Sequence, residues 1–102
     1  MNSIIERYRN LSIERSGIIL FSPKHALMII EEARNNNIPL LGVDGIFIFG
    51  KSTQPSLLNS VDFTLGKSHL DPYKIASDLV KNCKRHNLYF EIVLSETGLR
   101  ID

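Results

Sequence analysis

The chain lacks tryptophan, carries a single cysteine and contains no long apolar run. The one cysteine, Cys83, cannot form an internal disulfide, which fits a reducing compartment. The longest apolar runs, residues 17–21 and 46–49, are far shorter than the roughly 18 to 20 residues that a membrane-spanning helix needs. Charge begins at Glu6, too early for a secretion signal. These absences predict a soluble cytoplasmic protein.

A strong net charge is also missing, because 12 lysines and arginines nearly balance 11 aspartates and glutamates. No global field therefore steers the protein toward nucleic acid or an anionic membrane, and we expect it to bind neither directly. A length of 102 residues suffices for one modest core, and 43% hydrophobic residues is ordinary for a globular protein. We expect one folded domain over residues 1–102.

The N-terminal region predicts a helix followed by a strand. Ser3 and Glu6 have the spacing of a capping box, and the residues that follow Ser3 place an apolar stripe on one face of a short helix. Residues 17–21 form a short continuous apolar run ended by a serine and a proline. Such a run is typical of a central strand that is buried on both faces.

A second helix is expected directly after this strand. Ser22 can cap it, and Pro23 suits its first turn, where a missing N–H is tolerated. Three successive asparagines should end the helix near Asn35, and residues 38–41 supply the next strand. A strand, a helix and a strand joined by short connections predict a right-handed β-α-β unit with parallel strands.

The middle of the chain is harder to interpret. Residues 43–45 suggest a tight corner before a strand over residues 46–49, which either pairs with the preceding strand as a hairpin or continues it beyond a bulge. Residues 50–70 hold two glycines, one proline and six serines or threonines, and predict a long loop. The apolar residues expected to pin this loop down are Leu57, Leu58, Val61, Phe63 and Leu65.

The last third predicts a helix and a strand. Asp71 followed by Pro72 is a strong helix start. Residues 88–94 alternate between apolar and mixed positions, as in a strand with one wetter face, at an edge of the sheet. The expected fold is α/β, a single small domain with a mixed sheet of about four strands, a β-α-β unit and two to three helices. The strand order is not predicted.

One motif match is accidental. The phosphate-loop pattern is met letter for letter by Gly45, Gly50, Lys51 and Ser52. The four residues between the two glycines are β-branched or aromatic, which favours a strand over a loop whose amides turn toward an anion. Pro55 and a polar run then replace the helix that should follow such a loop.

No catalytic or metal-binding set stands out. The histidines are scattered at His25, His69 and His86. Cys83 and His86 are better explained as a core cysteine and a solvent-facing histidine than as metal ligands, because a zinc site needs more ligands. Residues 68–71 contain the residue types of a hydrolytic triad, but adjacency in sequence is not the geometry of a triad. We expect no metal and no cofactor.

Asp44 and Asp62 differ from the other acidic residues, since each lies beside apolar strand residues and outside a charged helix face. Both suit turn-forming aspartates. The alternative is that they contact an arginine or lysine of a partner. The basic stretch of Lys81, Lys84 and Arg85 is explained by the electrostatics of a helix C-terminus more simply than by phosphate binding.

The sequence from Ala33 to Asp44, and above all Ile-Pro-Leu-Leu-Gly-Val-Asp over residues 38–44, resembles bacterial polymorphic-toxin immunity proteins, in particular the immunity protein 40 family. In that family a helix leads through a polar turn into this motif, followed by an aromatic strand, a variable loop, a second helix and a last strand. The order of elements from about residue 17 to residue 94 is similar.

This resemblance implies a non-enzymatic protein of contact-dependent growth inhibition type, which binds the C-terminal domain of a cognate toxin, such as a nuclease, and blocks it. Predicted exposure alone selects the residues that would bind this partner: Asp44, Lys51, Gln54, Asn59, Asp62 and Lys67. A second hypothesis is a small hydrolase or nuclease that uses Asp44, Asp62 and His69. A third is a subunit that pairs with itself through its last strand, so the protein is expected to be a monomer or a weak homodimer.

Overall fold

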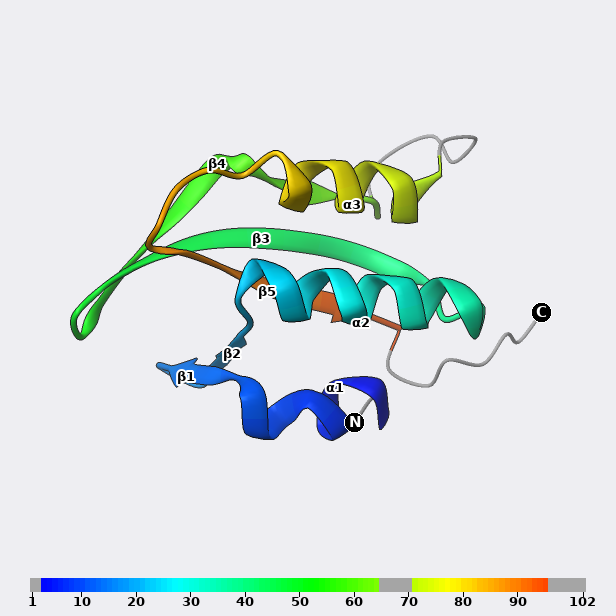
Figure 1. Ribbon diagram of the computed structural model, residues 1–102, viewed down its shortest axis with the longest axis horizontal. Helices are drawn as coiled ribbons and strands as arrows, with labels where there is room; N and C mark the ends of the chain where they lie inside the picture. Colours follow the sequence, from blue (N-terminus) through cyan, green and yellow to red (C-terminus); the bar gives the residue numbers. More distant parts are fainter. Residues whose placement is uncertain (1–2, 65–70, 96–102) are drawn as a thin grey trace.

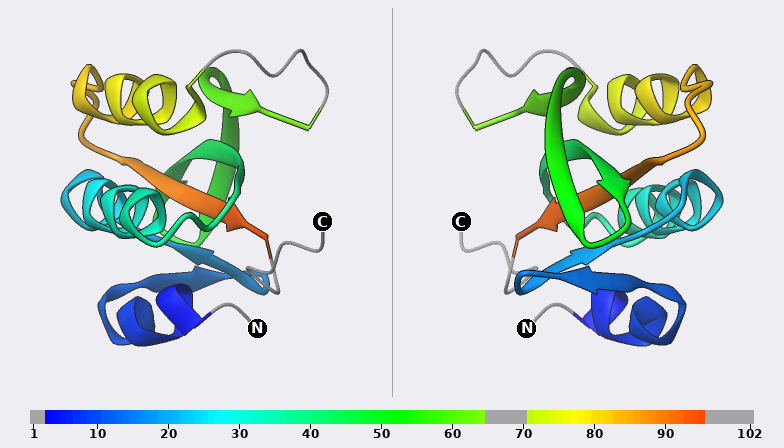
Figure 2. Two further views of the ribbon diagram at one scale, coloured as in Figure 1. Left: turned by 90° about the vertical axis from the view of Figure 1, so that its right-hand side faces the viewer. Right: turned by 90° about the vertical axis from the view of Figure 1, so that its left-hand side faces the viewer.

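The computed structural model describes residues 3–64 and 71–95, which form a layer of helices against a layer of strands (Figures 1 and 2). Figure 2 shows the three α-helices stacked along one side of the strands. This arrangement confirms the α/β fold class. The elements are α1 (Ser3–Tyr8), the 3-10 helix η1 (Arg9–Leu11), β1 (Ile13–Arg15), β2 (Ile18–Leu20), α2 (Pro23–Asn35), β3 (Leu40–Phe49), β4 (Ser52–Asp62), α3 (Pro72–Lys81) and β5 (Leu88–Leu94).

The described strands pair only in antiparallel fashion, so the expected mixed sheet is wrong. β2 and β3 do run parallel to each other on either side of α2, because each is antiparallel to β5, but β5 lies between them, so the expected β-α-β unit has a strand inserted in it. One sheet has the order β4-β3-β5, and β1 and β2 form a separate hairpin. The run over residues 17–21 is part of this hairpin and not a central strand. Ser16 and Gly17 both have positive φ at its turn, which reverses the chain where a straight strand was expected.

β5 is an edge strand of the three-stranded sheet, as its alternating pattern predicts, but its outer edge is partly covered. Phe21, just after β2, exchanges two backbone hydrogen bonds of 2.8 Å with Phe90 of β5. This antiparallel bridge joins the N-terminal hairpin to the main sheet. The last strand therefore lies between β3 and the end of β2.

The helices begin where the capping residues predict. Asp71 accepts hydrogen bonds from the backbone N–H groups of Tyr73 and Lys74, and Pro72 occupies the first turn of α3. Ser22 is the N-cap residue of α2, but its hydroxyl lies 3.3 Å from Nδ1 of His25 and does not bond the helix backbone. Helix α3 ends at Lys81, so the basic residues of positions 84–86 lie beyond it.

β3 is one long strand that passes through the expected corner. Val43, Asp44 and Gly45 all belong to it, and of the two alternatives left open, continuation beyond a bulge is confirmed. Asp44 is therefore not a turn residue. Two register shifts, at positions 40–42 against β5 and at positions 43–45 against β4, let the chain bend without ending the strand.

The expected loop over residues 50–70 is also wrong, because β4 occupies most of its described part. β3 and β4 form a hairpin whose two-residue turn is Gly50 and Lys51, with φ of +62° at Gly50. Pro55 is accommodated because β4 is the outer strand of the sheet, where a missing N–H breaks no ladder.

The core lies between the helices and the inner face of the sheet. Its fully buried side chains include Phe21, Ile29, Ile30, Val43, Val80 and Phe90. Val61 and Phe63 pack against this core, as expected. Leu57 and Leu58 do not, since they are 87% and 91% exposed, and Leu65 lies outside the described residues.

Candidate functional site

The face of the sheet that points away from the helices, called here the outer face, is not covered by any described helix (Figure 2). Alternation along β5 sends Leu88, Phe90, Ile92 and Leu94 into the core and leaves Tyr89, Glu91 and Val93 on the outer face. Residues directly opposite in neighbouring strands share a face, so the partners of these three in β3 also lie there. They are Ile46, Asp44 and Gly42.

Two carboxylates face each other on this outer face. Asp44 of β3 is the direct cross-strand partner of Glu91 of β5. Burial first, and the charge of Asp44 second, raise the pKa of Glu91 above its ordinary value. Among the described residues neither carboxylate forms an ion pair. Like charges directly opposite each other are destabilising, so the fold retains an unrelieved negative site here.

Asp62 lies near the same site. It is the cross-strand partner of Gly42, and together with Asp44 it lines a hollow of about 240 Å³. Oδ1 of Asp62 accepts a hydrogen bond of 2.9 Å from the N–H of Thr64 and one of 2.6 Å from its hydroxyl, and both lower the pKa of Asp62. Asp62 is thus held charged. Asp44, Asp62 and Glu91 together are called here the acidic trio.

The edge strand bulges beside Asp44. Val43 pairs with Val61 and Gly45 pairs with Ser56, so Asp44 alone faces residues 57–60 of β4. The base of this bulge is held by three hydrogen bonds: Ser56 Oγ to Asn59 Oδ1 at 2.9 Å, Ser60 Oγ to the Ser56 carbonyl at 2.7 Å, and the Gly45 N–H to Ser60 Oγ at 3.1 Å. Leu57 and Leu58, both exposed, lie within the bulge.

The structure therefore brings together three of the six residues predicted to bind a partner, namely Asp44, Asn59 and Asp62. Lys51 lies in the β3–β4 turn and Gln54 opposite Phe47, near the other end of the hairpin. Phe49 lies five positions along β3 from Asp44, a distance of about 16 Å. Lys67 lies outside the described residues, as does His69, the third member of the hypothetical catalytic set.

Sequence reasoning missed Glu91, Leu57 and Leu58. The alternation over residues 88–94 already predicts that Glu91 lies on the wetter face of its strand. The sequence does not predict that this strand pairs with the strand of Asp44. The sequence predicts that the two leucines pin down the loop over residues 50–70, but both are exposed. No pattern in the sequence marks their exposure.

An aromatic pair occupies the far end of the hairpin. The rings of Phe47 and Phe49 stack with their centroids 5.8 Å apart, and the guanidinium of Arg85 lies 4.9 Å from the centre of Phe47. Arg85 is thereby held over the ring by a cation–π contact. Lys51 and Arg85, the basic residues named at this end of the hairpin, are therefore separated along β3 from Asp44 and the rest of the acidic trio.

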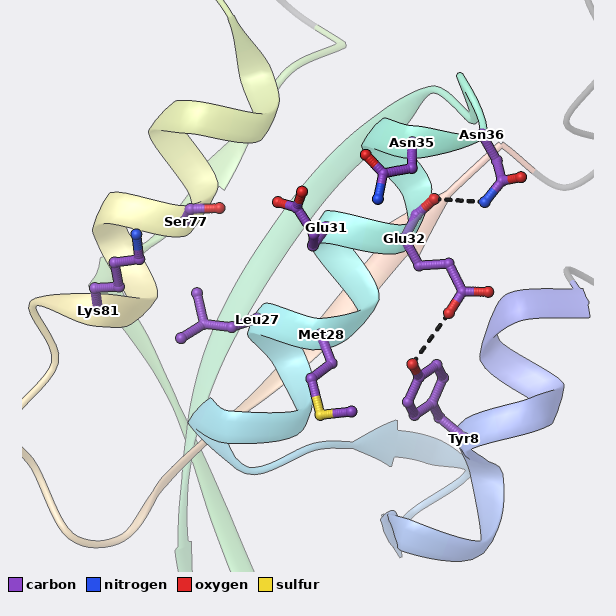
Figure 3. Close-up of a pocket in the computed structure, with 9 residues that line it drawn as sticks. All are labelled: Tyr8, Leu27, Met28, Glu31, Glu32, Asn35, Asn36, Ser77 and Lys81. Atoms are coloured by element: carbon purple, nitrogen blue, oxygen red, sulfur yellow. Dashed lines mark hydrogen bonds between the residues drawn. The ribbon is translucent and has the colours of Figure 1, made fainter.

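A second hollow, of about 630 Å³, is a groove between α2 and α3 that Tyr8 of α1 also lines (Figure 3). Its polar groups serve the fold. The Tyr8 hydroxyl donates to Oε1 of Glu32 at 3.0 Å, and the Asn36 amide donates to the Glu32 carbonyl at 2.8 Å (Figure 3). Arg7 also pairs with the Glu32 carboxylate.

Within residues 3–64 and 71–95, no three histidine, cysteine, aspartate or glutamate side chains gather closely enough to hold a metal ion. Cys83 is half-buried against the core and His86 is exposed, in agreement with the sequence interpretation. None of the described helices has both the length and the apolar character needed to cross a membrane.

Comparisons of the chain with protein-family models, with curated proteins and with solved structures found no match.

Proposed function

We propose that this chain is an immunity protein that binds and neutralises a bacterial toxin domain through the outer face of its sheet, without catalysis. The observation that carries the proposal is the Asp44–Glu91 pair, two directly opposed carboxylates on a face that no described helix covers. A cation supplied by a partner would relieve the repulsion between them.

The toxin domain would present arginine or lysine side chains to this site. Domains that act on nucleic acid carry such basic surfaces, because they must hold phosphates. An inhibitor that covers a basic surface with carboxylates competes directly with the substrate. The resemblance of residues 38–44 to immunity proteins supports the same function, and Asp44, the last residue of that motif, belongs to the proposed surface.

Growth rescue tests the proposal. The C-terminal domain of the toxin encoded by the neighbouring gene is expressed together with this chain in one cell, and we expect growth to be restored. Asp44→Lys and Glu91→Lys should each abolish rescue, since a cation would then face a cation. Glu31→Lys, an exposed change on α2, is the matched control and should rescue normally.

Failure of the unaltered chain to rescue growth, or the absence of any toxin gene beside it, would count against the proposal. Full rescue by both charge-reversed variants would also refute it, because the outer face would then play no part in neutralisation.

A further inference from the structure

The proposed surface has an apolar centre beside its charges. Leu57 and Leu58, called here the leucine knob, are 87% and 91% exposed, whereas the other exposed large apolar residues, Leu11, Met28 and Phe49, are between 44% and 51% exposed. Single exposed apolar side chains are common, but two adjacent leucines with almost no protein contact are not. Most of the apolar area of this pair remains available to a partner.

The knob stands on a rigid base. The hydrogen bonds among Ser56, Asn59 and Ser60 close the bulge, and the Gly45 N–H ties Ser60 to the neighbouring strand. A β-carbon built at Gly45 would lie 2.7 Å from the Asn59 carbonyl oxygen, so the bulge also packs closely against β3. Because the base is already ordered, little conformational entropy is lost when the knob is bound.

The surroundings of the knob identify the occupant. Residues 57–60 stand opposite Asp44, which shares its hollow with Asp62. An anionic membrane would be repelled by these carboxylates. A second copy of this chain that placed the same surface against this one would set the carboxylates of Asp44 and Asp62 against each other. A protein surface with an apolar recess and a basic rim complements both features.

We propose that the leucine knob is the apolar anchor of this interface and enters a recess of the toxin domain, while the acidic trio meets the basic rim of that recess. This inference rests on the proposed function. Buried apolar anchors at the centre of an interface govern how long a complex lasts, and charges around them govern how fast it forms. The two groups of residues should therefore be separable by kinetics.

The experiment measures association and dissociation rates of this chain with the purified C-terminal domain of the neighbouring toxin. Leu57→Ser and Leu58→Ser should each weaken binding by about tenfold or more, mainly through faster dissociation. Their association rates should keep the salt dependence of the unaltered chain. Asp44→Asn should instead slow association and flatten its salt dependence. Met28→Ser, a change at a half-exposed site on α2, is the control and should bind normally.

A change at the base of the bulge tests whether the ordered bulge, and not only the two leucine side chains, contributes to binding. Ser60→Ala removes the acceptor of the Gly45 N–H and one bond of the base while leaving both leucines in place. We expect faster hydrogen exchange at the Gly45 amide and faster dissociation of the toxin domain. Thermal melts of all variants confirm that each is folded.

The outcomes are distinguishable. If the unaltered chain does not bind the toxin domain, the proposed function fails and this inference with it. If it binds, but both leucine variants dissociate at the unaltered rate, only this inference fails. Leucine-dependent dimers in light scattering, or leucine-dependent sedimentation with phosphatidylglycerol vesicles, would also overturn it, because the knob would then serve a second copy or a membrane.

Discussion

Gly45 in β3 and Asn59 in the bulge of β4 pack so closely that there is no room for a side chain at Gly45. A β-carbon built there would lie 2.7 Å from the Asn59 carbonyl oxygen and 2.8 Å from its β-carbon. The nearest atom belongs to the backbone and cannot rotate away. The contact fixes the bulge, and with it the exposed leucines, against the central strand.

Gly45→Ala should therefore destabilise the protein by about 1 to 3 kcal/mol, because the bulge must shift to accept one methyl group. Urea unfolding followed by circular dichroism measures the change. Leu58→Ala, in the same bulge but exposed, is the control and should leave the free energy of unfolding almost unchanged. Equal stability of Gly45→Ala and the unaltered chain would show that the bulge is not held in this way.

Asp71→Ala should cost about 1 kcal/mol of stability, because the backbone N–H groups of Tyr73 and Lys74 lose their acceptor at the start of α3. Asp78→Ala is the comparison. It removes only an exposed ion pair with Lys74, one helical turn away, and should cost less than about 0.5 kcal/mol. If both changes had the same effect, charge and not capping would explain the loss.

Tyr73→Phe should cost about 1 kcal/mol, because the Tyr73 hydroxyl donates a 2.6 Å hydrogen bond to the Ile38 carbonyl and that acceptor would be left without this partner. The bond ties α3 to the segment that leads into β3. Tyr8→Phe is a matched control, since the Glu32 carboxylate keeps its ion pair with Arg7 after the change. Thermal unfolding should separate the two variants, and a larger loss for Tyr8→Phe would contradict this ranking.

The raised pKa of Glu91 predicts a pH dependence of stability. The folded chain holds this proton more tightly than the unfolded chain, so the contribution of Glu91 is fully present below its ordinary pKa of 4.5. It is lost as the pH rises through the higher pKa of the folded state. Glu91→Gln cannot ionise and should lose less stability over this window, as measured by urea unfolding at several pH values. Parallel curves for the two proteins would refute the shift.

Asp44→Asn should lower the pKa of Glu91 without returning it to the ordinary value. The reason is that burial, the larger cause of the shift, remains when the charge of Asp44 is removed. A carbon-detected NMR titration of the glutamate carboxyls reports this pKa directly. Asp78→Asn, on the surface of α3, should leave it unchanged. An Asp44→Asn variant with the same Glu91 pKa would mean that the two groups do not interact.

The sequence predicts the elements whose ends or faces are marked locally. Asp71 and Pro72 identify the start of α3, Ser22 and Pro23 that of α2, and strict alternation identifies β5. These signals depend only on residues close in sequence, so the predicted helix starts and strand agree with the folded structure. The fold class follows from them.

The strand pairing could not be predicted in the same way. β4 has no alternating pattern, because an edge strand with a wide bulge buries only Ser56 in its first half and leaves its leucines outside. The sequence also predicts a strand that begins at Gly17, but the positive φ of this residue belongs to a turn. In both places tertiary contacts, such as the bridge from Phe21 to Phe90, decide the structure.

Of the candidate site, the sequence supplied Asp44, Asn59 and Asp62 but not the residues that complete it. Glu91 lies 47 positions from Asp44 in the chain, and only the pairing of β3 with β5 brings the two together. Leu57 and Leu58 are exposed in a bulge that is closed by hydrogen bonds among Ser56, Asn59 and Ser60. The apolar character of the two leucines gives no sign of this exposure.

The placement of β5 has a consequence for synthesis on the ribosome. Of the described strands this one is made last, yet it lies between β3 and the end of β2 (Figure 1). Until residues 88–94 emerge, the β1–β2 and β3–β4 hairpins have no strand to join them. A nascent chain that stalls before Leu88 should therefore be cut by proteases more readily than one that includes residues 88–94.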